Sequence, residues 1–326
     1  MPTLSDPTHA VTLDAVRAAA RGLDGVAVRT PMVELPALIT RVGVPVSLKC
    51  EQLQPIGAFK IRGAYTAVAR VAAAGGSPGV VTASSGNHGQ AIAYSAQRFG
   101  LRAVVVMPGA TPRIKVEGVK RYGGEVVFAG PVRSAEQGVR AEAIARDEGL
   151  TLIPPFDHPD VVTDQATLGL EILEQRPEVE TILSPVSGGG LLAGISVAVA
   201  ALKPTVRLVG VEPEGAAKLT AALAAGEPTT LQRTESMADG LLTPSVGRFT
   251  WPILSRVVRE AVRVSEEEIG AAVRFLHREG GLRVEPSGAV TTAALLAGHV
   301  RPTGPTVAVV SGGNVDPDLF QRLAGQ

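Results

Sequence analysis

The feature that most constrains the fold of this chain is a regular alternation of short apolar runs with longer helix-like runs. The runs GVVTAS, RAVVVMP and TILSPVS are short, apolar and rich in β-branched residues, as are the buried strands of parallel sheets. Between such runs lie segments like GNHGQAIAYSAQRFG, with a polar start and a glycine end that are typical of a helix. The alternation predicts an α/β fold with right-handed crossovers.

The same patterns place the individual elements. An amphipathic helix is expected over residues 8–21. Pro- and Gly-rich breaks at 74–79 and 153–160 predict a small inserted domain over 79–156, and a large domain formed by 1–78 and 157–326. Strands are expected at 44–51, 79–84, 102–108, 125–130, 181–187, 206–212 and 306–311, and helices at 57–74, 86–100, 111–123 and 134–149.

Composition excludes several classes of protein. Lys plus Arg and Asp plus Glu both number 31 in 326 residues, so no charge excess favours a nucleic-acid or anionic-membrane partner. Cys50 is the single cysteine, which leaves no internal disulfide or zinc motif and makes a reducing cytoplasm the natural setting. The N-terminal segment lacks the pattern of a signal peptide, and the longest apolar stretch, 188–202, is too short to span a bilayer.

Three polar or glycine-rich loops follow predicted strands, where parallel sheets bind their ligands. The first, residues 84–89, reads Ser-Ser-Gly-Asn-His-Gly before a helix, and hydroxyls beside a helix N-terminus suit a carboxylate. The second, around Gly188–Gly190, lets the backbone approach a phosphate closely. The third, Ser311–Asn314, is by itself only a turn.

The glycine loop alone admits two interpretations. Gly188, Gly190 and Ala193 satisfy the relaxed dinucleotide fingerprint and Glu212 follows the next strand, so a nicotinamide-dependent dehydrogenase is one of them. That interpretation leaves the serine loop and Lys60 unexplained. Lys60 follows the apolar run Pro55–Phe59 at an expected helix start, where a solvated surface lysine is the ordinary interpretation. A phosphate-bearing aldehyde cofactor accounts for all of these features, because it needs an amine, a phosphate site and a partner for its ring nitrogen.

Five motifs, GAFKIRGA, SSGNHGQA, SGGGLLAG, EPSGA and SGGNVD, resemble in their order and spacing those of fold-type II pyridoxal-phosphate (PLP) enzymes. The resemblance covers about residues 35–316 and is greatest to threonine/serine dehydratases and serine racemases. It implies a tryptophan synthase β-like fold, with two domains that are each an open, mostly parallel twisted sheet flanked by helices. The large domain would anchor the cofactor, and the small domain would bind the substrate carboxylate.

The resemblance also implies roles for individual residues. Lys60 would hold PLP as a Schiff base and then act as the base, and Ser85 matches the opposite-face acid/base of racemases. The resemblance does not assign the pocket beyond the carboxylate site, for which Leu241, Leu242 and Thr243 are candidates. The implied cofactor residues are Phe59, Lys60, Asn87, Ser187, Gly188, Gly189, Gly190, Leu191, Gly240, Glu285 and Ser311, and the implied carboxylate residues are Ser84, Ser85, Asn87 and His88.

The implied reaction is dehydration and deamination of L-threonine, L-serine or both to a 2-oxo acid and ammonia through an aminoacrylate, by a homodimer acting on a small amino acid. The alternatives are an amino-acid racemase, a dehydratase of another 3-hydroxy amino acid, a silent amino-acid-binding protein and, remotely, the dehydrogenase. Two departures from the family are visible. Glu212 and Ala216 match a family metal site but Lys218 replaces the third ligand, so no divalent metal is expected. Glu136 stands where racemases carry an arginine, although Arg133 is near.

Overall fold

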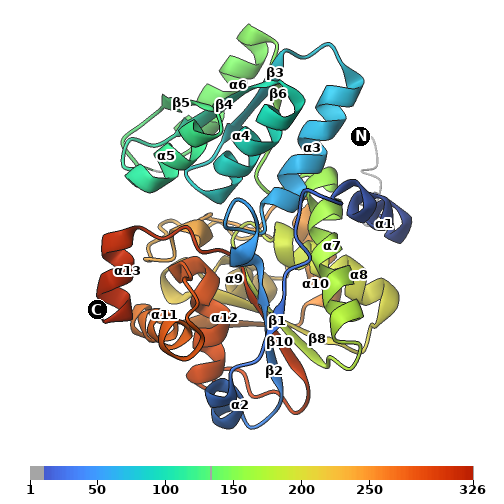
Figure 1. Cartoon of the computed structure of the whole chain (residues 1–326), viewed down its shortest axis with the longest axis vertical. Helices are drawn as coiled ribbons and strands as arrows, with labels where there is room; N and C mark the ends of the chain where they lie inside the picture. Colours follow the sequence, from blue (N-terminus) through green and yellow to red (C-terminus); the bar gives the residue numbers. More distant parts are fainter. Residues whose placement is uncertain (1–10, 133, 326) are drawn as a thin grey trace.

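The computed structural model describes residues 11–132 and 134–325 and contains two separate sheets (Figure 1). The large sheet has the order β1-β2-β10-β7-β8-β9, and the small sheet has the order β5-β4-β3-β6. Among the strands of the described residues, every pairing is parallel except that of β1 with β2. The strands are β1 Met32–Val33, β2 Val46–Cys50, β3 Gly79–Ala83, β4 Arg102–Met107, β5 Glu125–Phe128, β6 Thr151–Leu152, β7 Thr181–Pro185, β8 Arg207–Pro213, β9 Glu260–Val264 and β10 Thr306–Val310.

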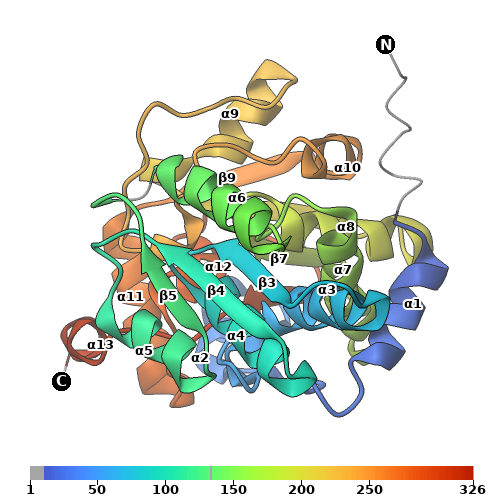
Figure 2. The ribbon, with the colours of Figure 1, turned by 90° about the horizontal axis from the view of Figure 1, so that it is seen from above.

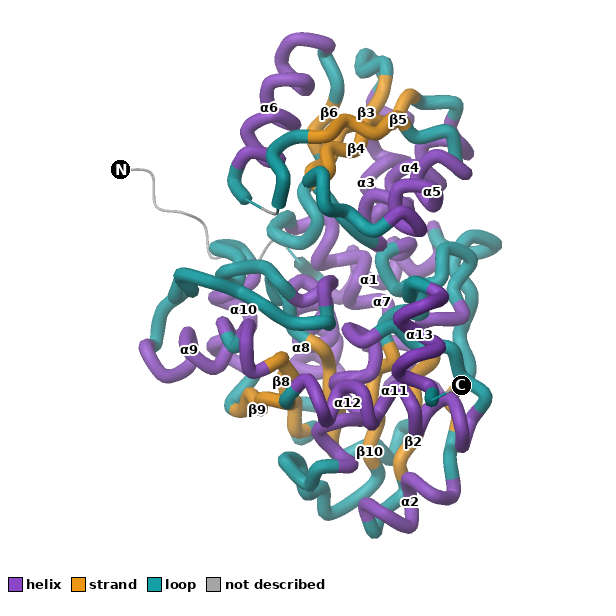
Figure 3. The backbone as a smooth tube through the Cα atoms, turned by 90° about the vertical axis from the view of Figure 1, so that its left-hand side faces the viewer, coloured by secondary structure: helices purple, strands orange, loops and turns teal. Residues whose placement is uncertain are grey.

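Helices cover both faces of each sheet (Figures 2 and 3). They are α1 Leu13–Gly22, α2 Pro36–Val42, α3 Ile61–Ala74, α4 Asn87–Phe99, α5 Arg113–Arg121, α6 Glu136–Glu148, α7 Pro159–Gln175, α8 Gly190–Leu202, α9 Lys218–Ala225, α10 Thr250–Val257, α11 Glu266–Gly280, α12 Pro286–Leu296 and α13 Pro317–Ala324. Short 3-10 turns are η2 Glu51–Leu53, η3 Glu214–Ala216 and η4 Asp239–Leu241. No helix in the described ranges is long and apolar enough to cross a membrane.

Alternating side chains of the buried strands supply the core on each face. In β10, Val307 and Val309 pack with α7, α8 and α10, whereas Ala308 and Val310 pack with α11 and α12. In the small sheet, Val105 faces α3 and α4, and Val104 faces α6. Because strands buried on both faces read as continuous apolar runs, this packing explains why the sequence pattern identified them.

The expected elements are present, with one correction that bears on function. The helix predicted over 57–74 begins only at Ile61, so residues 57–60 precede it instead of forming its first turn. Gly57 has φ +72°, and Ala58 forms an isolated bridge with Gly312. Of the helix predicted over 8–21, residues 8–10 lie outside the described residues, and the helix α1 begins at Leu13 with Thr12 as its N-cap.

Helix α3 connects the two sheets. It packs against α4, which covers the small sheet, and against α7, which covers the large one. The predicted domain division at residues 78/79 and 156/157 stays a prediction, since α3 lies before the first boundary but contacts both halves.

A buried ion cluster fixes the start of α3. The Arg62 guanidinium donates to Glu51 (Nε to Oε2, 2.9 Å) and to Glu171 (Nη1 to Oε1, 2.7 Å). Lys49 adds a bond from Nζ to Glu171 Oε2 of 2.7 Å. Burial opposes the charge of Arg62, yet Glu51 and Glu171 raise its pKa above the ordinary value. The cluster therefore ties the end of β2, α3 and α7 together, and it holds the residue two positions earlier, Lys60, in place.

Candidate active site

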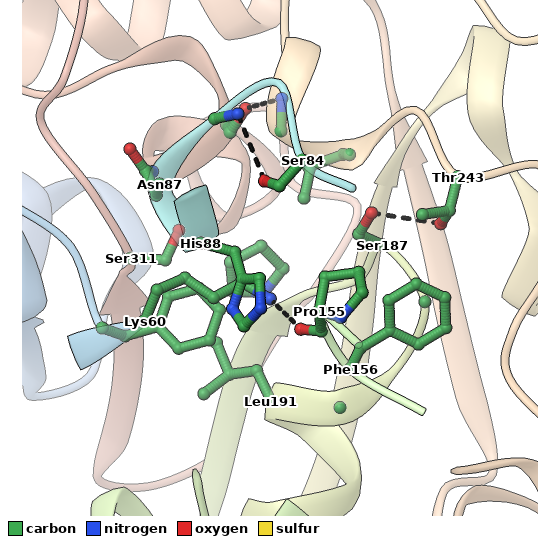
Figure 4. Close-up of a pocket in the computed structure, with 18 of the residues that line it drawn as sticks. Lys60, Ser84, Asn87, His88, Pro155, Phe156, Ser187, Leu191, Thr243 and Ser311 are labelled. Carbon is green, nitrogen blue, oxygen red and sulfur yellow. Dashed lines mark hydrogen bonds between the residues drawn. The ribbon is translucent and has the colours of Figure 1, made fainter. Parts of the chain in front are cut away.

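A cavity of about 120 Å³ lies where the carboxyl ends of β3, β7 and β10 meet (Figure 4). The structure brings every predicted cofactor and carboxylate residue to its wall, although these residues are scattered over the sequence. Of the expected substrate-side residues, Leu241 and Thr243 line the cavity and Leu242 does not. The predicted residues along its wall are Phe59, Lys60, Ser84, Ser85, Asn87, His88, Ser187, Gly188, Gly189, Gly190, Leu191, Gly240, Glu285 and Ser311.

Lys60 projects into this cavity from the residue before α3. Its Nζ donates to the carbonyl of Pro155 at 2.6 Å (Figure 4). The same Nζ lies 5.2 Å from the centre of the Phe59 ring. Burial lowers the pKa of Lys60 to about 8. The described part of the chain gives this ammonium no carboxylate partner, so burial is not offset and a neutral amine becomes accessible near neutral pH.

The serine loop is shaped by its own hydrogen bonds. Ser84 Oγ accepts from the backbone N–H groups of Gly86 (3.3 Å) and Gly89 (3.2 Å), which turns the chain from β3 into α4. The ring of His88 is buried, with Nε2 3.4 Å from the carbonyl of Ile153. Burial and the nearby Lys60 charge lower the pKa of His88 to about 3, so this imidazole is neutral.

The glycine loop joins β7 to α8 and is walled by an aromatic ring. A Cβ at Gly188 would overlap the ring of Phe156, and one at Gly190 would lie 3.0 Å from Phe156 Cβ. Gly189 has φ +92°, which a residue with a side chain adopts only with strain. Thr250 Oγ1 donates to the carbonyl of Gly188 at 2.8 Å. The loop is therefore set before any ligand arrives, with the N-terminal N–H groups of α8 free for an anion.

Polar groups on the opposite wall form a short relay. Asn87 Nδ2 donates to Glu285 Oε1 at 2.6 Å, and Asn87 Oδ1 accepts from Asn314 Nδ2 at 2.8 Å. Glu285 Oε2 is buried without a hydrogen-bond partner, and burial raises the pKa of this carboxyl to about 7. Ser311 directly follows β10, and its carbonyl accepts from Phe59 N–H at 3.1 Å.

The residues of the family metal site lie outside the cavity. Lys218 is fully buried, and its Nζ donates to the carbonyls of Val186 (3.2 Å) and Leu241 (2.7 Å). Glu212 Oε1 is 3.6 Å from this ammonium. Ala216 ends η3 beside them. Glu136, on α6, does not line the cavity either, and Arg133 lies outside the described residues.

Sequence reasoning missed several residues of the wall. Phe156 and Pro155 lie in the segment that returns from the small sheet, which the sequence marks only as a Pro-rich break. Lys115 also lines the cavity, from α5, and Ser287 lines it from α12. The scarcity of lysine in an arginine-rich chain was the one available signal for Lys115.

Comparison with known proteins assigns the family. Residues 23–312 match the family described as pyridoxal-phosphate dependent enzymes. The chain belongs to this family. A glycine loop open to a phosphate, an amine with a lowered pKa and the unpaired oxygen of Glu285 fit such a cofactor, so sequence and cavity agree. The predicted fold class and PLP dependence are confirmed, and nothing supports a nicotinamide-dependent dehydrogenase.

Its relatives carry two kinds of name. The chain is 41% identical to an L-threonine ammonia-lyase of Geobacter sulfurreducens, over 88% of this chain and 72% of that protein. It is 40% identical to a biosynthetic L-threonine dehydratase of Pasteurella multocida over 82% of this chain, but it spans about half (52%) of that relative's length. The structure of maize serine racemase superposes with a TM-score of 0.92 at 35% identity and covers 96% of both chains.

Proposed function

We propose that this chain is a PLP-dependent ammonia-lyase that converts L-threonine, L-serine or both to a 2-oxo acid and ammonia. The names of its relatives support the reaction class. The observation that carries the proposal is the position of Lys60, since an amine with a pKa lowered to about 8 shares one small cavity with an anion loop and a serine loop.

Different cavity residues would bind different parts of the cofactor. Lys60 would bind PLP covalently as a Schiff base, and the backbone N–H groups of Ser187–Leu191 would bind the phosphate. Phe59, Asn87 and Ser311 would surround the ring, with Glu285 and Gly240 at its edge. When bound, the cofactor supplies an electron sink that makes the α-proton of an amino acid acidic.

Lys60 would then act as the base for that proton. An amine with a pKa near 8 has a substantial neutral fraction at physiological pH, and a base works best when its pKa is close to the working pH. The carbonyl of Pro155 holds Nζ in the cavity. A backbone carbonyl can only accept, so this contact orients the amine without competing for its lone pair.

The substrate carboxylate would bind at the start of α4. Ser84, Ser85 and Asn87 offer hydroxyl, amide and backbone donors there, beside the positive end of the helix. His88 is neutral, so it would contribute shape and a hydrogen bond, not charge. The division into a large domain that anchors the cofactor and a small domain that carries this loop belongs to the same proposal.

A racemase is the second candidate, because one observation favours it. Ser85 lines the same cavity as Lys60, so a hydroxyl is available to exchange a proton as well as the amine. The similarity to maize serine racemase supports the same alternative. A homodimer and a cytoplasmic location complete the proposal. The buried thiol of Cys50 is compatible with a reducing compartment, and sedimentation of the holoenzyme measures the oligomeric state.

The deciding experiment is a substrate panel. Holoenzyme is incubated with L-serine, L-threonine and bulkier 3-hydroxy amino acids, and 2-oxo acid and ammonia are measured together with the chirality of the residual amino acid. A lyase gives equimolar 2-oxo acid and ammonia from L-threonine or L-serine. Accumulation of D-serine without 2-oxo acid would identify the racemase, and absence of both products across the panel would refute both candidates.

A further inference from the structure

One ion pair lies beside the cavity. Lys115 Nζ, from α5, is bonded to Asp239 Oδ2, from η4. Helix α5 packs on α4 and β5, in the small-sheet half, whereas η4 packs on α12, in the large-sheet half. The pair therefore joins the two halves of the molecule next to the cavity.

Both partners stand next to the groups that would handle substrate. Lys115 and Gly240 line the cavity, and a Cβ built on Gly86 of the serine loop would lie 3.8 Å from Lys115 Nζ. The charges of Lys115 and Asp239 act in opposite directions on the pKa of Glu285, which burial raises to about 7. The pair thus lies beside the serine loop and within electrostatic range of Glu285.

Losing the ion pair would cost Lys115 more than Asp239, because the two side chains differ in exposure. The Lys115 side chain is 5% exposed, whereas that of Asp239 is 35% exposed. A buried ammonium without a counter-charge is costly, but a carboxylate at the surface is readily hydrated. Loss of the pair is therefore tolerable for Asp239 and intolerable for Lys115, unless another anion takes the place of the aspartate.

The turn that carries Asp239 is held on both sides. Gly240 N–H donates to Ser287 Oγ at 2.9 Å, and the carbonyl of Leu241 accepts from Lys218. A change of partner therefore does not require the turn to unfold. Of the cavity-lining cations in the described ranges, Lys60 would be committed to the cofactor and His88 is neutral, which leaves Lys115 to meet an incoming anion.

We propose that Lys115 exchanges partners: it binds Asp239 while no amino acid is bound, and it binds the substrate carboxylate when an amino acid enters. Asp239 is then an internal competitor of the substrate carboxylate for Lys115. This inference rests on the proposed function only in taking an amino acid as the ligand.

The test measures binding without turnover. Holoenzyme is titrated calorimetrically with L-alanine, which has the amino and carboxylate groups of a substrate but no leaving group on Cβ. We expect Lys115→Met to weaken binding about 10- to 100-fold, the range for losing one charged hydrogen bond. We expect Asp239→Asn to tighten binding several-fold, because the competing carboxylate is gone. The double variant should bind as weakly as Lys115→Met.

Partner exchange predicts that the two single variants change the affinity for L-alanine in opposite directions, which distinguishes it from a purely structural ion pair. A structural pair predicts that both single variants weaken binding together, and that result would overturn the proposal, as would wild-type affinity in Lys115→Met. Asp239→Asn alone decides the sign if Lys115→Met fails to fold. Arg113→Met is the matched control, since Arg113 lies on the same helix and pairs with Glu117 at the surface. Its affinity should equal that of the wild type.

Failure of the proposed function gives a different result. If no 3-hydroxy amino acid is turned over, the lyase and its substrates are wrong, while the signs of the two alanine titrations still decide the partner exchange. If turnover is present and both variants change affinity in the same direction, only the partner exchange is wrong. The visible absorbance of each variant reports that its cofactor is loaded.

Discussion

Lys60 and Arg62 lie two residues apart at the start of α3, but their surroundings shift their pKa values in opposite directions. Arg62 faces away from the cavity, is 1% exposed, and is bonded to the carboxylates of Glu51 and Glu171. Lys60 faces into the cavity and has one acceptor, the carbonyl of Pro155. The pKa of Arg62 is raised by its partners, and that of Lys60 is lowered to about 8 by burial.

The difference separates a structural charge from a chemical one. A buried cation surrounded by carboxylates stays protonated and fixes the backbone around it. A buried amine with only a neutral acceptor can give up its proton at a modest cost. Because the two residues share one helix start, the Arg62 cluster provides the rigid support from which Lys60 extends. Substitutions on the two sides should therefore affect different properties of the protein.

The largest effect should come from Lys60→Ala. We expect lyase turnover to fall below detection, at least about 10³-fold, because this change removes both the covalent anchor and the base. The visible absorbance of bound cofactor should be lost as well, while the far-UV circular dichroism of the protein is unchanged. Lys120→Ala, at an exposed lysine of α5, is the matched control and should keep wild-type turnover. Wild-type turnover in Lys60→Ala would show that the whole assignment is wrong.

Arg62→Met should act mainly on stability. It leaves Glu51 buried without its main partner, which costs about 3–5 kcal/mol in the free energy of unfolding. Urea unfolding of the apoprotein measures this loss, and adding Glu51→Gln to Arg62→Met should recover part of it. A loss under about 1 kcal/mol, the range of exposed ion pairs, would mean that the cluster does not support α3.

A third, smaller effect is the pH dependence of the Lys60 contribution. The pKa is about 8 in the folded chain and 10.5 in the unfolded one, so the unfolded state binds more protons between these values. Wild-type stability relative to Lys60→Met therefore rises with pH across this window. We expect the stability advantage of the apo Lys60→Met variant to be greatest below pH 8 and to vanish by about pH 10.5. A pH-independent difference would contradict the lowered pKa.

The last prediction is that added Mg²⁺ has no effect, and it concerns the buried Lys218. Lys218 has two carbonyl acceptors and lies near Glu212. We therefore propose that its ammonium occupies the position of the family metal ion and that no divalent ion binds there. Mg²⁺ added after chelation should leave both the melting temperature and the turnover unchanged. A clear rise in either would contradict this proposal and would show that a cation binds in spite of Lys218.

The sequence predicted the parts of the molecule that follow repetitive physical rules. Buried strands such as β4 and β10 are recognisable as continuous apolar runs because both of their faces are covered. The glycine loop is recognisable because close approach of the backbone requires residues without side chains. The residues brought together at the cavity were identified from their motifs, and the geometry agrees that they share one wall. Their individual roles remain proposals that the experiments above address.

What sequence could not supply depends on contacts between distant segments. The start of α3 was predicted four residues early, because the bridge of Ala58 with Gly312 and the fit of Gly57 against Asn314 are tertiary effects. In the sequence, nothing distinguishes Phe156 from any other aromatic residue in a loop, and only the structure shows that its ring lies against Gly188. Likewise, nothing local to Lys115 indicates an aspartate 124 positions away as its partner.

The position of β10 has a consequence for how the protein is made. This last strand lies in the middle of the large sheet, between β2 and β7. During synthesis, β2 and β7 each keep one open edge until Thr306–Val310 emerges, and Ser311 reaches the cavity only then. The small sheet, from one continuous stretch, can complete its pairing far earlier. We therefore expect cofactor capture to be a late event, and a nascent chain stalled before β10 would expose two strand edges of the kind that promote aggregation.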